Sequence, residues 1–350
     1  MKNKYIKLFA SCKLIQGHSQ ACIYDLERGT IVTVPNDLIL LMEEASKTTI
    51  IDLEKKYGKE IIQEYIDFLL KKELIFITDE PENFPTISTE YLTPTIIHNS
   101  IVVISEKTKN DIINISNQLK KLLCRFIEFR ITANVDEQYL DTIVSNFKNC
   151  SVQSILFYAQ YSPEMMGIMD RLVNKYLKIG LVTLFNTEEV HIPEFKKRIF
   201  IAKGFLDNRN CGYIDQSKFA CNLPTYTLSL NFNSCLYKKI SVDAEGNIKN
   251  CPSMVKSHGN INDTLLSDVI SIPEFQKKGL IKKDEIAKCK DCEFRYICTD
   301  CRAYTENHED EYSAPLKCGY SPYTGEWEEW SDNPLKQKAI SFYKMEIIKP

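Results

Sequence analysis

The chain of 350 residues is 44% hydrophobic and 26% charged, with a formal net charge of −3 at pH 7. This length suits about two domains, and the apolar content is sufficient for their cores. So small a net charge excludes the broad positive field of proteins that bind nucleic acid or anionic membranes. No apolar run is long enough for a membrane span or a signal peptide, so we expect a cytoplasmic protein without membrane partners.

Residues 1–80 have a β-then-α pattern. Short alternating runs predict strands in KYIKLFASCKLIQG (4–17), SQACIYDL (19–26) and RGTIVTVP (28–35). Apolar stripes and cap residues then predict three helices, in the ranges 36–46, 49–58 and 59–75. A further strand, IFITD (75–79), completes a winged-helix-like module.

Residues 81–94 are rich in proline and lack periodicity, which is typical of a linker. In the next segment, 95–221, strand and helix patterns alternate. The predicted strands are SIVVIS (100–105), RFIEFRIT (125–132), SVQSILFYA (151–159), LVTLFNT (181–187) and KRIFIAKGF (197–205). Alternation of this kind favours a parallel sheet with covering helices. Since a complete barrel needs eight units, we expect a partial β/α barrel here, in a chain of the α/β class.

Residues 222–350 form a cysteine-rich segment with little helical periodicity. We expect short strands in TYTLSLNF (225–232) and KKISVDAEG (238–246), and a weakly helical tail in KQKAISFYKMEII (336–348). Gly246 occupies a hairpin turn that requires positive φ. This hairpin would return Cys251 to the neighbourhood of Cys235.

The chain has thirteen cysteines, and seven of them lie between Cys235 and Cys318. Their order is C-x10-G-x4-C, then C-x2-C-x5-C-x2-C, then one more, at positions 235, 251, 289, 292, 298, 301 and 318. An odd count in a reducing compartment argues against disulfides. Two intervening residues let both sulfurs of a pair face one metal, and the spacing alone leaves zinc and iron–sulfur equally open.

A bound metal cannot fold this segment alone. A structural site contributes roughly 10–16 kcal/mol of folding free energy, whereas ordering the backbone costs about 1–2 kcal/mol per residue. The cysteine-rich segment must therefore also pack on an apolar surface, for which we expect the preceding sheet.

The cysteine pattern resembles the SPASM domain, the C-terminal module of many peptide-modifying radical SAM proteins. This chain has two residues between Cys298 and Cys301 where the family has three. The resemblance implies two [4Fe–4S] clusters. One would be held by Cys289, Cys292, Cys298 and Cys318, and the other by Cys235, Cys251 and Cys301. The eighth ligand could come from Cys221 or Cys211, which are otherwise thiols without a metal.

The motif that binds the catalytic cluster of radical SAM enzymes, C-x3-C-x2-C, is absent from the sequence. SIVVISEKTKND (100–111) stands where that motif would follow the first strand of the sheet segment. Without these three thiolates no iron is available to bind and cleave S-adenosylmethionine. We therefore expect a degenerate radical-SAM-like domain that performs no ordinary radical SAM chemistry.

This three-part order resembles the SPASM-domain peptide maturases of grasp-with-spasm systems. The resemblance implies a maturation protein for a ribosomally synthesised, post-translationally modified peptide, which acts with an ATP-grasp peptide ligase. Whether such a chain catalyses a reaction stays open. The alternative from another class is a zinc-binding scaffold or regulator without redox activity.

By the same resemblance, residues 1–80 are similar to a RiPP recognition element that binds the leader of a precursor peptide. Such an element adds the peptide as a strand to an open sheet edge. The matching residues are the strand Thr30, Ile31, Val32, Thr33 and Val34, together with Tyr65 and Lys71 of the helix in 60–72. A DNA-binding winged helix is the alternative, but this helix carries as much negative as positive charge.

Overall fold

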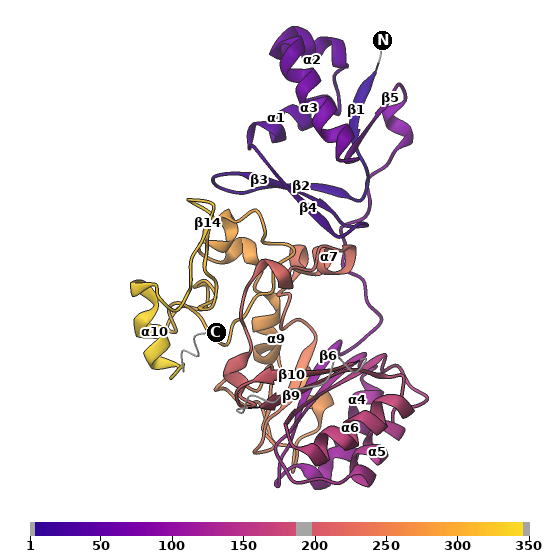
Figure 1. Cartoon of the computed structure of the whole chain (residues 1–350), viewed down its shortest axis with the longest axis vertical. Coiled ribbons are helices and arrows are strands. Elements are labelled where there is room, and N and C mark those ends of the chain that lie inside the picture. The colour runs from indigo at the N-terminus through magenta and orange to yellow at the C-terminus, as the bar shows by residue number, and fades with distance from the viewer. Residues whose placement is uncertain (1–3, 187–197, 346–350) are drawn as a thin grey trace. The chain divides into compact units, whose positions relative to one another are not determined.

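We analysed a computed structural model of the chain, which describes residues 4–186 and 198–345. It is a mixed α/β protein with a large parallel sheet, and its contacts divide the chain into two compact units (Figure 1). Unit 1 comprises Met1–Tyr91, Tyr213–Ser234 and Ile281–Pro350, and unit 2 comprises Leu92–Gly212 and Cys235–Leu280. The sequence-based boundaries at 80, 94 and 221 stay predictions about domains. The cysteine-rich segment contributes to both units.

The N-terminal part of unit 1 contains the strands and helices that the sequence predicts. Two short strands, β1 (Tyr5–Leu8) and β5 (Ile75–Thr78), pair antiparallel. A separate antiparallel sheet has the order β2 (Cys12–Gln16), β3 (Ala21–Asp25), β4 (Thr30–Val34). The helices are α1 (Asp37–Ala45), α2 (Ile50–Tyr57) and α3 (Lys59–Lys71).

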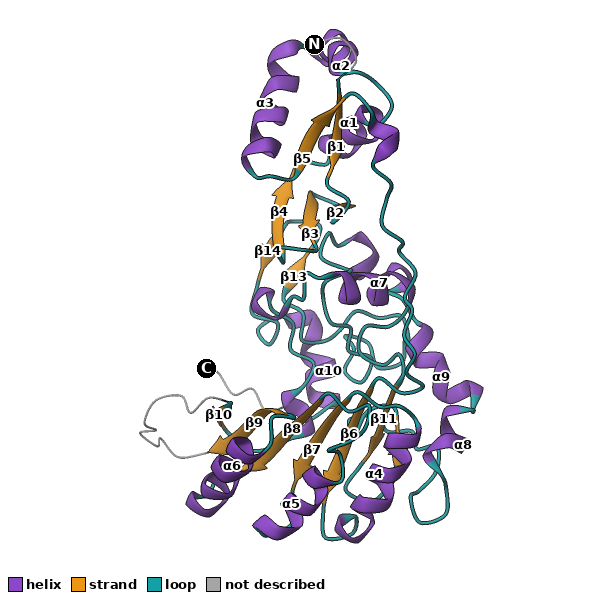
Figure 2. Cartoon of the chain, turned by 90° about the vertical axis from the view of Figure 1, so that its right-hand side faces the viewer, coloured by secondary structure: helices purple, strands orange, loops and turns teal. Residues whose placement is uncertain are grey.

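Strand β3 is buried at all five positions because both faces of its sheet are covered. Alternate side chains point to opposite faces. Ile23 and Ala21 pack into the core that helices α1–α3 share, whereas Cys22 and Tyr24 pack against aromatic residues of the C-terminal segment. The sheet therefore lies between the three helices on one side and the segment around helix α7 (Leu223–Asn231) on the other (Figures 1 and 2).

Helix α7 replaces a predicted strand, so the prediction for TYTLSLNF (225–232) was wrong. The alternation of apolar residues indicated a strand, but local signals specify a helix. The side chain of Asn222 accepts a hydrogen bond from the Thr225 N–H at 2.9 Å, and Pro224 occupies the first turn. Both features favour a helix start, and burial against the sheet then stabilises it.

The C-terminal part of unit 1 packs on the N-terminal sheet rather than standing alone. In the turn between β2 and β3, the His18 N–H donates to the Asp291 carbonyl at 2.8 Å. The Gln20 amide donates to the Glu293 carboxylate at 2.6 Å, and the Tyr24 hydroxyl donates to the Glu293 carbonyl. We expected the cysteine-rich segment to pack on the sheet of the preceding segment. In the structure, residues 281–345 pack on the N-terminal sheet instead.

The remaining elements of unit 1 are short. Strands β13 (Tyr320–Ser321) and β14 (Glu326–Trp327) form an antiparallel pair. Helix α10 (Gln337–Phe342) lies within the predicted helical tail, whose last residues, 346–348, fall outside the described residues.

Unit 2 is built on a seven-stranded sheet of order β10-β9-β8-β7-β6-β11-β12. The five predicted strands are present, as β6 (Asn99–Ile104), β7 (Phe126–Ile131), β8 (Ser154–Gln160), β9 (Ile179–Asn186) and β10 (Ile199–Lys203). The predicted ends at Thr187 and Lys197 lie outside the described residues. These strands pair in parallel, which confirms the predicted parallel sheet.

Helices cover one face of this sheet. They are α4 (Ile112–Lys121), α5 (Glu137–Ser145) and α6 (Pro163–Lys175), which lie along the strands in Figure 2. Two shorter helices, α8 (Leu266–Ile270) and α9 (Pro273–Leu280), add apolar residues to the same core. Since Phe129 points into this core, its neighbours Glu128 and Arg130 point to the opposite face of the sheet.

A hairpin extends the sheet at its other edge. Strand β11 (Lys239–Val242) pairs parallel with β6 and antiparallel with β12 (Ile248–Lys249). Gly246 lies in the turn with φ of 81°, as the sequence predicts. Among the described residues, no helix is long and apolar enough to cross a membrane.

The turn at Gly246 gives a test of this fold. Gly246→Ala forces a side chain into left-handed backbone, so we expect unit 2 to lose about 1–2 kcal/mol of unfolding free energy. Gly167→Ala is the matched control, because Gly167 lies inside helix α6 and its added methyl meets only the flexible end of Arg171. There alanine should be neutral or stabilising by up to about 1 kcal/mol. Urea denaturation of both variants measures the difference, and equal stabilities would contradict the assignment.

Candidate functional site

Four cysteines of unit 1 line one cavity. They are the residues that the SPASM resemblance assigns to one cluster, Cys289, Cys292, Cys298 and Cys318. The rest of the wall is mainly aromatic and aliphatic, and includes Phe219, Phe294 and Trp327. The space between these side chains, part of which is open to solvent, is about 420 Å³. A thiol-lined cavity in apolar surroundings is suited to a metal group that is shielded from water.

The backbone around the first pair explains how its thiols reach the same space. Cys289–Asp291 forms a single 3-10 turn, and the Cys292 N–H donates to the Cys289 carbonyl at 3.0 Å. The Phe294 N–H then donates to the Cys292 sulfur at 3.4 Å. Such N–H···S bonds stabilise negative charge on sulfur.

The other two cysteines are fixed by contacts from distant parts of unit 1. The Ser234 hydroxyl donates to the Cys298 carbonyl at 3.2 Å and accepts from the Asp300 N–H at 3.0 Å. The buried Lys336 ammonium donates to the carbonyls of Leu316, at 2.9 Å, and Cys318. Segments far apart in sequence thus hold the four thiols around one space.

Burial disfavours ionisation of these thiols when no metal is present. It raises the pKa of Cys289 to about 12, and it also raises the pKa of Cys292 and Cys298. Lys283 lies beside them. Burial alone would lower the pKa of its ammonium, but negative charge on the Cys298 and Cys289 sulfurs would raise that pKa above its usual value. No local sequence pattern indicates Lys283, which lies six positions before Cys289.

A second thiol group lies in unit 2. Burial alone would lower the pKa of the Lys239 ammonium. Negative charge on three sulfurs would raise this pKa instead, and in decreasing order of effect these sulfurs belong to Cys235, Cys251 and Cys211. The Lys239 Nζ lies 3.7 Å from the Cys235 sulfur. Lys239 is on the sheet face opposite the helices, because its neighbour Ile240 packs into the helix-covered core. This group contains Cys211, one of two candidates for the eighth ligand.

Polar contacts place Cys211 in this group. The loop before it is capped by Asp207, whose side chain accepts from the Arg209 N–H at 2.7 Å. Arg130, whose side chain is only 8% exposed, pairs with Glu128 at 2.6 Å and also donates to the Asn208 side chain. The ion pair Glu128–Arg130 is therefore part of the same site, and the sequence analysis missed it.

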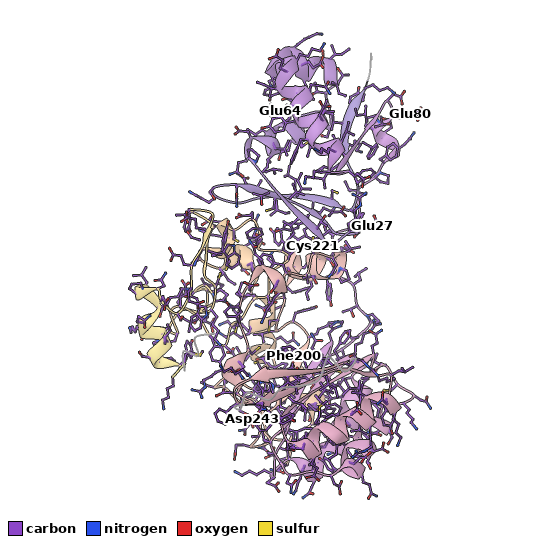
Figure 3. The ribbon with its side chains drawn as sticks, viewed as in Figure 1. Glu27, Glu64, Glu80, Phe200, Cys221 and Asp243 are labelled. Atoms are coloured by element: carbon purple, nitrogen blue, oxygen red, sulfur yellow. The ribbon has the colours of Figure 1, made fainter. Side chains whose placement is uncertain are left out.

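Cys221, the other candidate, lies elsewhere. Its thiol is buried beneath the N-terminal sheet and donates to the carbonyls of Asp25, at 3.5 Å, and Thr30, at 3.3 Å (Figure 3). Cys301 belongs to unit 1, where it packs in an apolar cluster with Tyr304 and Leu316. Its grouping with Cys235 and Cys251 of unit 2 stays a prediction.

The geometry of the thiols bears on what they could hold. Among residues 4–186 and 198–345, no three His, Cys, Asp or Glu side chains converge as ligands of a single metal ion. None of the thirteen cysteines, all of which are described, forms a disulfide. The four thiols of unit 1 line one cavity but do not form such a group.

The residues predicted to bind a peptide lie on strand β4 and on helix α3. Strand β4 is an edge strand of its sheet, and Thr30 and Thr33 are exposed while Ile31 and Val32 are half-buried. On helix α3, Tyr65 packs partly against the core and Lys71 is exposed. Two further apolar side chains on this helix, Ile61 and Phe68, are 53% and 38% exposed.

Comparison with known proteins gives few matches. No protein-family model matches the chain, and no curated protein matches it. Among solved structures, SuiB of Streptococcus suis bound to S-adenosylmethionine is similar at 10% identity, over 89% of this chain and 98% of that chain, with a TM-score of 0.32. Another structure of Streptococcus suis SuiB is similar at 10% identity, over 90% and 98%, with a TM-score of 0.35. Values at this level establish neither a common fold nor a common activity.

The raised pKa of Cys289 predicts how pH changes the stability of the metal-free protein. A thiol with a raised pKa stabilises the fold below its ordinary value of 9.0, and this contribution is lost as pH rises toward 12. At about pH 10.5 the loss should reach about 2 kcal/mol. Guanidinium denaturation at rising pH measures it.

Cys289→Ser is the control for that measurement, because serine does not ionise in this range. The metal-free variant should lose less stability than the metal-free wild type over the same pH interval. Equal losses in the two proteins would show that the Cys289 thiol is not held neutral by burial.

Proposed function

We propose that this protein is a maturation factor for a ribosomally synthesised, post-translationally modified peptide. It would bind the leader of the precursor through its N-terminal module and hold [4Fe–4S] clusters on its cysteines. It would act in the cytoplasm beside an ATP-grasp peptide ligase. The observation that carries the proposal is the single cavity lined by Cys289, Cys292, Cys298 and Cys318.

The order of the thiols, which matches the SPASM pattern, favours an iron–sulfur cage over zinc. Four of them line one cavity. A cluster of four irons places its thiolates at the corners of a cage, and the apolar wall suits it. When bound, such clusters supply one-electron transfer.

The unit 2 group supports a second, incomplete site. Cys211, Cys235 and Cys251 lie around Lys239, and Cys301 is assigned to this cluster only by the SPASM resemblance. Of the two candidates for an additional ligand, the structure favours Cys211, because the Cys221 thiol is engaged by carbonyls of the N-terminal sheet.

The N-terminal module offers a surface for an extended peptide. An added strand at β4 would satisfy the unpaired backbone groups of that edge. Side chains of the peptide could then contact the stripe Ile61, Tyr65 and Phe68, whose spacing of four and three residues places them on one face of helix α3. Helix α3 carries little net charge, which agrees with a peptide rather than DNA as the ligand.

Metal analysis of anaerobically purified protein tests the clusters. We expect a brown protein with iron and sulfide in equal amounts, and no stoichiometric zinc. Cys211→Ser should reduce bound iron to about half, since one of two clusters is lost. Cys221→Ser is the matched control and should keep the wild-type iron content. A colourless protein with zinc would support the scaffold alternative, and iron loss in Cys221→Ser alone would contradict the ligand assignment.

Peptide binding can be tested with a fluorescent synthetic precursor peptide encoded beside this gene. Tyr65→Ala should weaken binding by about tenfold, as truncation of a central aromatic contact typically does. Lys71→Glu should also weaken it, and Lys59→Glu is the charge-matched control at the opposite end of helix α3. Fluorescence anisotropy gives the three affinities. Binding that is absent in the wild type, or equal in all variants, would remove the leader-binding role.

A further inference from the structure

Near each thiol group lie a buried arginine and a buried lysine that have different kinds of partner. In unit 1, Arg302 pairs with Asp300 at 2.7 Å, and their side chains are 1% and 0% exposed. In unit 2, Arg130 pairs with Glu128 at 2.6 Å. Both arginines are thus neutralised by a carboxylate.

The lysines face sulfur instead. Lys283 is 4% exposed, lines the same cavity as Cys289 and Cys298, and donates to the Thr299 carbonyl at 3.2 Å. Lys239 is 9% exposed, and its Nζ donates to the Cys235 sulfur at 3.7 Å. Neither lysine forms a salt bridge with a carboxylate in the part of the chain that the structure describes. Asp300, the acid near Lys283, is already bound by Arg302 and by the Asn233 amide at 2.6 Å.

A buried ammonium without a counter-ion costs several kcal/mol. Neutral thiols do not offset that cost, but thiolates bound to a metal cluster do. A [4Fe–4S]²⁺ core with four thiolates carries a net charge of −2, and one-electron reduction makes it more negative. A fixed positive charge beside the sulfur therefore stabilises the reduced form more than the oxidised form.

Building on the proposed function, we propose that Lys283 and Lys239 are the internal counter-ions of the two clusters. Each holds its ammonium beside ligand sulfur and raises the reduction potential of its own cluster. The two lysines are positioning residues for the metal centres, and they act on the clusters through Cys298 and Cys235.

The test is a redox titration of the full-length, iron-loaded protein, followed by electron paramagnetic resonance. Lys283→Met should shift the reduction equilibrium of one cluster at least tenfold toward the oxidised form, which equals about 59 mV for one electron. Lys239→Met should shift the other cluster in the same direction. Lys290→Met removes an exposed lysine next to Cys289, and water screens its charge, so its shift should stay below about twofold.

Iron content keeps the outcomes distinct. Full iron in Lys283→Met with an unchanged potential overturns the proposal. If Lys283→Met takes up no iron, the Lys283→Arg variant distinguishes a charge role from a packing role. Iron uptake by Lys283→Arg with a near wild-type potential supports the counter-ion role. A Lys283→Arg protein without iron overturns that role in favour of packing. A wild-type protein that binds no iron overturns the proposed function itself, which is a separate result from unshifted potentials in iron-loaded variants.

Discussion

The structure of unit 1 depends on covering both faces of one small sheet. Strand β3 is buried throughout because helices α1–α3 cover one face and the cysteine-rich segment covers the other. Neither layer alone would bury the strand. The same contact orders the segment around Cys289 and Cys292, since the turn between β2 and β3 hydrogen-bonds to Asp291 and Glu293. The N-terminal module therefore helps to position the loop that carries two of the four cavity thiols.

A buried carboxylate at this contact shows how tightly the two layers are joined. Glu293 is fully buried directly after Cys292, and it accepts hydrogen bonds from Gln20 and Tyr320. An alanine methyl at Gly17 would come within 2.7 Å of the Glu293 carboxylate, so a side chain at this turn would collide with it. Removing one partner of a buried charged group leaves it unsatisfied, which is costly. The hairpin turn and the cysteine loop therefore depend on each other.

Local sequence patterns predicted most of the helices and strands. They could not predict contacts between residues that lie far apart in the chain. Five strand patterns matched the parallel strands of unit 2, because buried parallel strands appear as continuous apolar runs. The turn at Gly246 and the close approach of Cys289 and Cys292 were predicted from residue spacing alone. Helix α7 was mispredicted since its alternation imitates a strand. Lys239 and Lys283 were missed because a buried lysine has no sequence signature until its neighbours in space are known.

Unit 1 is assembled from three separated stretches of chain, and this has a consequence for biosynthesis. Residues 92–280 contain all of unit 2, so its sheet can close while the C-terminal stretch is still being translated. The N-terminal strands, by contrast, must wait for Phe294, Tyr296 and Tyr320 before the second face of their sheet is covered. Under the proposed function, metal binding at the unit 1 thiols would therefore come late, and the N-terminal sheet of a nascent chain would expose one apolar face until the C-terminal stretch has been made.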